Sequence, residues 1–210
     1  MVSPKNKPKG YFDFLLAADC ETTGLAYNSD DASIESDGKY YQSIAWGLVV
    51  ADANTLLPVE KLYVEIKWDK KSIWSPQAEK VHGLSREYLE QNGIDSADAV
   101  VQIGGLILKY WGPTNSIRLL GHNVATFDMW FLKRLMRSEG IDLKFGNRHI
   151  DTSGAGFLTF NTYTSDELFA AVGLPERDAH KHNALDDALH SLHSARTIRL
   201  LWNKFVKPQL

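Results

Sequence analysis

The chain has 210 residues, of which 44% are apolar, and its 23 Lys and Arg against 26 Asp and Glu give a formal net charge of −3. No apolar run reaches the roughly 18 residues that span a bilayer, and the single Cys20 excludes an internal disulfide. We therefore expect a soluble, cytoplasmic protein with one sizeable core and no membrane partner.

No internal repeat, low-complexity tract or Pro/Gly/Ser-rich linker divides the sequence. We expect a single domain over residues 11–205, with a basic tail at 1–10 and a short C-terminal tail at 206–210.

The first half of the chain is rich in β-strand signals. Residues 11–19 are apolar and aromatic, and the segments 40–52 and 59–67 are β-rich, the latter with clean alternation. Short connections predict that these three segments form an antiparallel meander. The polar stretch 26–40, AYNSDDASIESDGKY, is interpreted as an exposed loop or flexible hairpin, with a functional lid as the alternative.

The remaining segments alternate between helical and short strand patterns. Ser85 and Ser96 are expected to cap the second and third helices. Gly140 is expected to end the fourth helix. Helices are expected at 75–83, 85–93, 96–111, 126–140, 165–173 and 184–205, and further strands at 116–123 and 148–153.

The final helix carries an apolar stripe at spacings of three and four. Its members are Ala184, Ala188, Leu192, Ala195, Ile198 and Trp202. Five strands with helices between and after them predict an α/β fold with a mixed sheet flanked by helices.

Two carboxylates follow the first strand, in the stretch LLAADCETTGL. Side chains alternate along a strand, so Asp19 and Glu21 point to one face and Cys20 to the other. Neighbouring acids repel unless a cation lies between them. The alternative is that Asp19 only caps the turn that follows.

Two further candidates lie later in the chain. Asp128 follows a strand and an Asn, where it could bind a cation or simply favour the start of a helix. His182 and Asp187 are five residues apart, about 140° around a helix, so a shared site requires His182 to lie before the helix or in its first turn. Asp186 would then be an ordinary first-turn acid.

Taken together, these motifs resemble those of the DEDDh (DnaQ-like) group of 3′–5′ exonucleases, which have a ribonuclease H-like fold. DCETTGL resembles the first motif of the group, HNVATFD the second and HNALDD the third, and SPQAEKVHGLS resembles a segment that holds the terminal nucleotide. The resemblance covers roughly residues 12–203. The spacing from Asn123 to Asp128 is one residue longer than in many proofreading members.

The resemblance implies a phosphodiester hydrolase with two divalent cations, Mg²⁺ or Mn²⁺. Asp19 would bridge the cations, Glu21 and Asp187 would bind one of them, and Asp128 the other. His182 would be the general base. If these four acids are metal ligands, 22 acids remain against 23 Lys and Arg. This near-neutral balance counts against a broad basic groove and is compatible with a small site that holds one strand end.

The resemblance also names substrate contacts. Leu25 would be a wedge against the terminal base or an ordinary turn residue, and His82 a sugar or phosphate contact or a polar helix end. Phe127 would stack on a base or belong to the core. The expected substrate-binding residues are Thr22, Leu25, His82, Asn123 and Phe127.

The predicted function is removal of nucleoside 5′-monophosphates from the 3′ end of nucleic acid, preferably single-stranded or frayed. DCETTGL is closer to the DNA-degrading members, so DNA is favoured and RNA is the alternative. A non-catalytic nucleic-acid-binding module is a further alternative, which the presence of all four acids and the histidine counts against. No segment indicates a polymerase partner.

Overall fold

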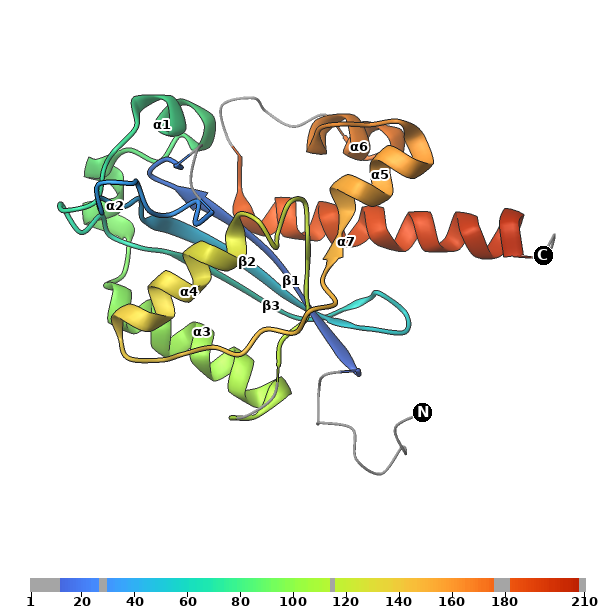
Figure 1. Ribbon diagram of the computed structural model, residues 1–210, viewed down its shortest axis with the longest axis horizontal. Coiled ribbons are helices and arrows are strands. Elements are labelled where there is room, and N and C mark those ends of the chain that lie inside the picture. The colour runs from blue at the N-terminus through green and yellow to red at the C-terminus, as the bar shows by residue number, and fades with distance from the viewer. Residues whose placement is uncertain (1–11, 27–29, 114–115, 176–181, 208–210) are drawn as a thin grey trace.

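The computed structural model describes residues 12–26, 30–113, 116–175 and 182–207 (Figure 1), so the expected N-terminal tail lies outside the described residues. Five strands form one mixed sheet in the order β3-β2-β1-β4-β5. The strands are β1 (Phe14–Thr22), β2 (Ser43–Asp52), β3 (Pro58–Glu65), β4 (Leu119–Gly121) and β5 (Ile150–Asp151). The helices are α1 (Pro76–His82), α2 (Arg86–Asn92), α3 (Ser96–Trp111), α4 (Asp128–Ser138), α5 (Thr152–Phe160), α6 (Ser165–Ala171) and α7 (Ala184–Leu201), which continues into a π-helical turn at Trp202–Val206.

The first three strands form the predicted antiparallel meander, with Asp19 of β1 opposite Gly47 of β2. Strands β4 and β5 add in parallel on the other side of β1. The carboxyl ends of β1, β4 and β5 therefore meet at one edge of the sheet, where ligand sites of α/β folds commonly lie.

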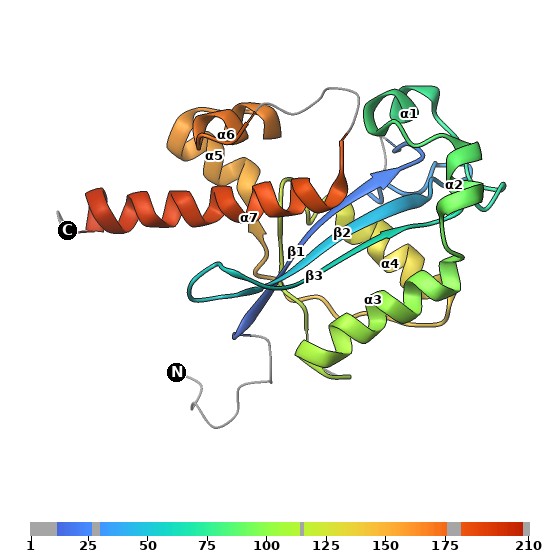
Figure 2. The ribbon, with the colours of Figure 1, turned by 180° about the vertical axis from the view of Figure 1, so that it is seen from behind.

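Helices cover both faces of the sheet (Figures 1 and 2). Alternation along β1 sends Leu15 and Ala17 toward α7, and Leu16, Ala18 and Cys20 into the larger core under α3 and α4. The stripe of α7 is buried from Ala184 to Ala195. Trp202, the last member of the stripe, is 51% exposed, because α7 runs beyond the sheet.

The structure differs from the expectations at one helix cap and by one additional helix. Ser96 does not cap α3; Asp95 occupies the N-cap position, without a side-chain cap bond. Residues 152–160 form helix α5, which the sequence analysis did not predict, since two glycines and scattered apolar residues give it no stripe.

The described part of the polar segment 26–40 is not simply an exposed loop. Ile34 pairs with Tyr40 in a narrow hairpin, and Ser33 is fully buried. The Ser33 hydroxyl donates to Asp31 and accepts a hydrogen bond from Arg134 Nε of α4 at 3.0 Å. The hairpin therefore rests on α4.

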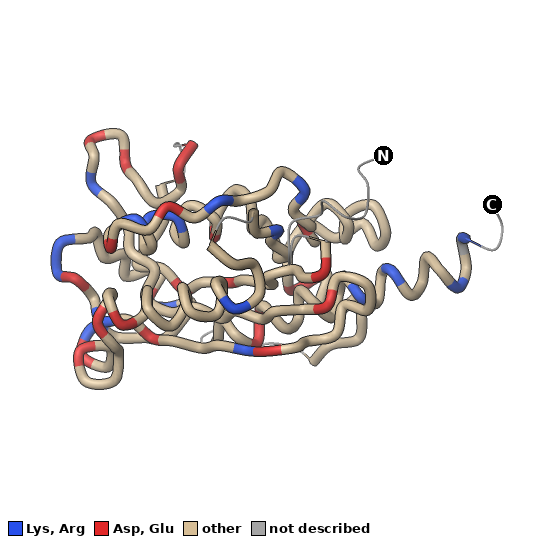
Figure 3. The backbone as a smooth tube through the Cα atoms, turned by 90° about the horizontal axis from the view of Figure 1, so that it is seen from below, with Lys and Arg blue, Asp and Glu red and all other residues tan. Residues whose placement is uncertain are grey.

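Charges of both signs alternate over most of the chain (Figure 3), in keeping with the near-neutral balance of the sequence. Within the described residues, no helix is both long and apolar enough to cross a membrane.

Candidate active site

An open pocket of about 460 Å³ lies at the edge where β1 ends. It is lined by β1 and the turn after it, the hairpin, α1, the segment before α4, α6 and the start of α7. Of the residues expected from the sequence, Asp19, Glu21, Thr22, Leu25, His82, Phe127, His182 and Asp187 line this pocket.

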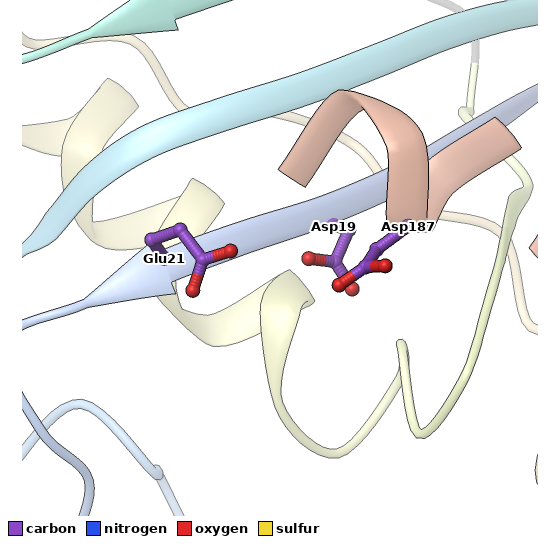
Figure 4. A group of neighbouring side chains, drawn as sticks. All are labelled: Asp19, Glu21 and Asp187. Atoms are coloured by element: carbon purple, nitrogen blue, oxygen red, sulfur yellow. The ribbon is translucent and has the colours of Figure 1, made fainter. Parts of the chain in front are cut away.

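Three carboxylates gather in the pocket. Each of Asp19, Glu21 and Asp187 offers an oxygen, and these oxygens all lie within 4.8 Å of one another. Figure 4 shows Asp19 and Asp187 side by side, from β1 and α7, with the Glu21 carboxylate turned toward them from further along the strand. The shared face of Asp19 and Glu21 is thus confirmed, and that face is the one that α7 covers.

Helix α7 begins close to the sheet because β2 has a glycine opposite Asp19. A Cβ atom at Gly47 would lie 2.2 Å from the backbone of Ala184. The Asn183 side chain accepts from the backbone N–H groups of Leu185 and Asp186, and so caps the helix. This arrangement turns Asp187 inward and leaves Asp186 exposed, as predicted.

His182 precedes the N-cap residue, which is the position that a shared site with Asp187 requires. Its Nδ1 lies 3.7 Å from Asp187 Oδ2, and its side chain is 20% exposed. Its backbone N–H donates to the Val81 carbonyl of α1 at 3.4 Å. The imidazole therefore stands beside the carboxylates at the margin of the pocket.

Asp128 does not join the three carboxylates. It begins α4, on the opposite face of the sheet, and hydrogen-bonds with Cys20. Its side chain is buried, and burial raises the pKa of Asp128 to about 7. Burial, and next the charge of Asp128, raise the pKa of Cys20. Cation binding by Asp128 stays a prediction.

The turn after β1 forms one wall of the pocket. Thr22 is buried and donates its hydroxyl hydrogen to the Gly24 carbonyl at 3.0 Å, so it closes the turn. Leu25 is half-buried and lines the pocket. A Cβ atom at Gly24 would lie 2.4 Å from the Tyr41 ring, so this turn packs closely on the hairpin side of the pocket.

His82 is the buried last residue of α1, and Nδ1 of its ring accepts from the Leu84 N–H at 3.0 Å. Burial lowers the pKa of His82 to about 4. Phe127 lines the pocket and also packs on Phe131 at 5.0 Å between ring centroids, so its two predicted roles are compatible.

Asn123 is exposed and lies outside the pocket lining. Its φ of 59° places it in the left-handed region, and its N–H donates to Asp151 Oδ1 at 3.0 Å. Asp151 also caps α5. The structure gives Asn123 a role in the turn after β4, and a substrate contact stays a prediction.

The pocket also contains residues that the sequence analysis did not single out. Glu35 and Tyr41 come from the hairpin side, and the Tyr41 hydroxyl donates to Glu35 Oε1 at 2.9 Å. His122 lies within the second motif, HNVATFD, which was its only signal. The further lining residues are Ser75, Gln77, Ala78, Val81, His122, Ser165, Phe169 and Ser191.

The donor set of the pocket suits a hard divalent cation. Mg²⁺ and Mn²⁺ prefer carboxylate oxygens and commonly keep water or substrate phosphate as their other ligands. Three clustered carboxylates in an open pocket offer this combination. Asp19, Glu21 and Asp187 therefore fit a site for such a cation.

The fold is ribonuclease H-like, a mixed five-stranded sheet flanked by helices. Neither a protein-family model nor a curated protein sequence matches the chain. Similar solved structures include E. coli exonuclease I with a dT13 oligonucleotide, at 14% identity and a TM-score of 0.71 over 93% of this chain and 43% of that one.

The zinc-bound complex of E. coli exonuclease I with single-stranded DNA is also similar, at 15% identity and a TM-score of 0.70 over 93% of this chain and 42% of that one. Exonuclease I from Methylocaldum szegediense gives 16% identity and a TM-score of 0.70 over 91% and 41%. The chain thus spans about two fifths of the length of these solved structures.

Proposed function

We propose that the protein is a metal-dependent 3′–5′ exonuclease that releases nucleoside 5′-monophosphates from DNA, preferably from single-stranded or frayed ends. The observation that carries this proposal is the group Asp19, Glu21 and Asp187 with His182 beside it, in one open pocket. The three motifs of the sequence support the exonuclease class. Structural similarity to exonuclease I, solved with single-stranded oligonucleotides, supports the substrate.

In this proposal, Asp19, Glu21 and Asp187 hold divalent cations at the end of β1, and Asp128 takes part from the α4 side. Bound there, the cations supply positive charge beside the scissile phosphate and acidify water. The carboxylates fix where this charge lies, because two come from a central strand and one from a helix packed on that strand.

His182 would take the proton of the attacking water. An imidazole accepts protons near neutral pH, and a general base contributes roughly a hundredfold or more to such reactions. Asp187 Oδ2 lies 3.7 Å from its Nδ1, which places the imidazole beside the carboxylate cluster. The protonated imidazole can then be neutralised by solvent, because the side chain is partly exposed.

Leu25 and His82 would hold the terminal nucleotide from the turn after β1 and from α1. A small pocket with an apolar wall binds a base that is already free of its partner strand. Unpairing costs a few kcal/mol, which a blunt duplex must supply and a single strand need not. The proposal thus predicts faster cleavage of single strands.

Digestion of 5′-labelled strands tests the proposal. Single-stranded DNA, blunt duplex DNA and RNA of one sequence, with a circular DNA strand, are incubated with Mg²⁺ or Mn²⁺ and with chelator. We expect a ladder of successively shortened labelled strands, fastest from single-stranded DNA, and no reaction in chelator.

Each other outcome has a distinct meaning. Immediate release of the label as a mononucleotide would reverse the polarity, and a cut circle would make the protein an endonuclease. Faster digestion of RNA than of DNA would make the protein an exoribonuclease. If no strand is digested, the remaining hypothesis is a non-catalytic nucleic-acid-binding module.

A further inference from the structure

We infer that the face of α4 that carries Trp130, Lys133, Arg134 and Arg137, together with the hairpin side of the groove beside it, binds the backbone of the single-stranded substrate 5′ of its terminal nucleotide. This inference rests on the proposed function. To the pocket for the 3′-terminal nucleotide it adds a short binding track for the nucleotides on the 5′ side of that end.

The face in question is a stripe that starts at the active-site pocket. Phe127 lines the pocket, and Trp130, Arg134 and Arg137 follow at spacings of three and four, which places them along one side of α4. Lys133 lies beside Trp130, with its Nζ 4.4 Å from the ring centroid. At a rise of 1.5 Å per residue the stripe from Phe127 to Arg137 is about 15 Å long, room for a few nucleotides.

The stripe forms one wall of a groove of about 740 Å³. The other wall comes from the hairpin at Ile34 and Tyr40 and from Asp69 and Lys71. Glu35 and Tyr41 of the same hairpin line the active-site pocket. The groove and the pocket therefore lie on two sides of one narrow hairpin, and the start of α4 borders both, because Phe127 lines the pocket and Trp130 lines the groove. A strand that ends in the pocket can continue into the groove along α4.

Cations dominate the groove wall on α4. Among the described residues, no carboxylate lies within ion-pair distance of Lys133 or Arg134. Arg137 pairs with Asp142 at 2.8 Å, but both side chains are exposed, and such a pair contributes little. A phosphate can replace Asp142 as the partner of Arg137.

The acids of the groove are engaged in local structure. Asp69 accepts from the Tyr40 hydroxyl and from the N–H groups of Lys71 and Ser72, and Asp31 accepts from Ser33. These hydrogen bonds fix the two carboxylates in the turns that they stabilise. Glu139 lies exposed at the far end of the groove. Because its carboxylate repels phosphates, the track is limited to the part of the groove near the pocket.

Paired rings and cations suit unpaired nucleotides in particular. The Arg134 guanidinium lies 4.8 Å from the Tyr40 ring centroid, and Lys133 lies near both Trp130 and Phe145. Proteins that bind single strands combine a basic groove for the phosphates with aromatic rings on which bases stack. The groove offers both, with Trp130 and Lys133 on the α4 wall and Tyr40 on the hairpin wall, so single-stranded nucleic acid is its partner.

Length-dependent binding tests the track. Labelled thymidine oligonucleotides of two, four, six and eight residues are titrated in chelator, where they are not hydrolysed. We expect wild-type affinity to rise with length and then level off. Lys133→Gln combined with Arg137→Gln should abolish this rise, weaken eight-residue binding about tenfold, and lower the salt slope by roughly 0.7 for each phosphate that the variant no longer neutralises. Trp130→Leu should reduce the rise without changing the salt slope.

Two control variants remove cations elsewhere. Lys204→Gln alters an exposed cation near the end of the described chain, and Arg86→Gln removes the guanidinium that stacks on Trp68 and Trp74. Both should keep the rise of affinity with length. A rise that persists in the α4 double variant would overturn the inference, as would a rise that Arg86→Gln abolishes equally or equal wild-type affinity for all four lengths. Wild-type hydrolysis of the shortest oligonucleotide with Mn²⁺ tests the proposed function separately.

Discussion

At the scale of single residues, alternation along β1 separates two kinds of carboxyl group. Asp19 faces α7 and joins Glu21 and Asp187, whereas Cys20 faces α4 and meets Asp128. Burial raises the pKa of Asp128 to about 7, so near neutral pH this carboxyl is divided between its protonated and its ionised form. A cation is the partner that would favour its ionised form.

His82 makes a testable contribution to stability. Burial lowers its pKa from 6.5 to about 4, so between these values the unfolded chain binds a proton that the folded chain does not. Stability from this group is full above pH 6.5 and falls as the pH drops toward 4, by at most about 1.4 kcal/mol per pH unit. Urea unfolding at pH 7, 6 and 5 should therefore show a steeper loss for wild type than for His82→Gln.

The exposed His193 provides the control for this measurement. His193→Gln should follow the wild-type pH dependence. If the unfolding free energies of wild type and His82→Gln fall in parallel as the pH is lowered, the buried imidazole does not titrate as described.

His182 should affect turnover and not cation binding. We expect His182→Asn to lower kcat by about a hundredfold or more, because the attacking water loses its proton acceptor. Mn²⁺ affinity should stay close to that of wild type, since the three carboxylates are retained. Single-turnover digestion and Mn²⁺ titration measure the two quantities, and a variant with wild-type kcat would remove His182 from the proposed mechanism.

At the scale of elements, the contact between β2 and the start of α7 sets the geometry of the site. A Cβ at Gly47 would overlap the backbone of Ala184 and Leu185, so Gly47→Ala must push α7 away from the sheet. We expect a loss of about 2 kcal/mol or more in unfolding free energy and a large loss of activity, because Asp187 moves away from Asp19.

Gly105 is the matched control for this substitution. It lies in α3 with nothing within 4 Å of an added Cβ, so Gly105→Ala should be neutral or stabilise by about 0.5–1 kcal/mol. Thermal unfolding and turnover of both variants give the comparison. A Gly47→Ala protein with wild-type stability and turnover would contradict the role given to this contact.

Elements with a strong local signal were predictable from the sequence. The alternation of 59–67, the Ser85 cap and the stripe of α7 led to the right strands and helices. Helix α5 was missed because its stability comes from packing: an added Cβ at Gly156 would lie 2.7 Å from Thr162 Oγ1. The hairpin at 34–40 was one of the two expected forms of this segment, but its packing on α4 was not expected, because Arg134, a hundred residues on, holds it through Ser33.

The geometry of the candidate site was predictable to a similar degree. Strand periodicity placed Asp19 and Glu21 on one face, and helix geometry required His182 to precede α7, as found. The position of Asp128 could not be predicted, because its side chain could turn to either side of the end of β1. Glu35 and Tyr41 reach the pocket through the hairpin, which has no local motif.

At the scale of the whole molecule, the sheet brings distant segments to one edge. The three clustered carboxylates come from residues 19, 21 and 187, and both helical layers leave that edge open. Near-neutral charge elsewhere means that few phosphates are neutralised on binding, so the salt dependence of DNA binding should be shallow apart from the α4 track.

The central claim is that Asp19, Glu21 and Asp187 form a divalent-cation site, and calorimetric titration with Mn²⁺ tests it most directly. Wild type and Asp186→Asn, which alters the neighbouring exposed acid, should bind Mn²⁺ alike. Asp19→Asn should bind at least about tenfold more weakly and, without cation, unfold at the same or a higher temperature, because repulsion in the cluster is relieved. Undiminished Mn²⁺ affinity in Asp19→Asn, or no binding by wild type, would contradict the account.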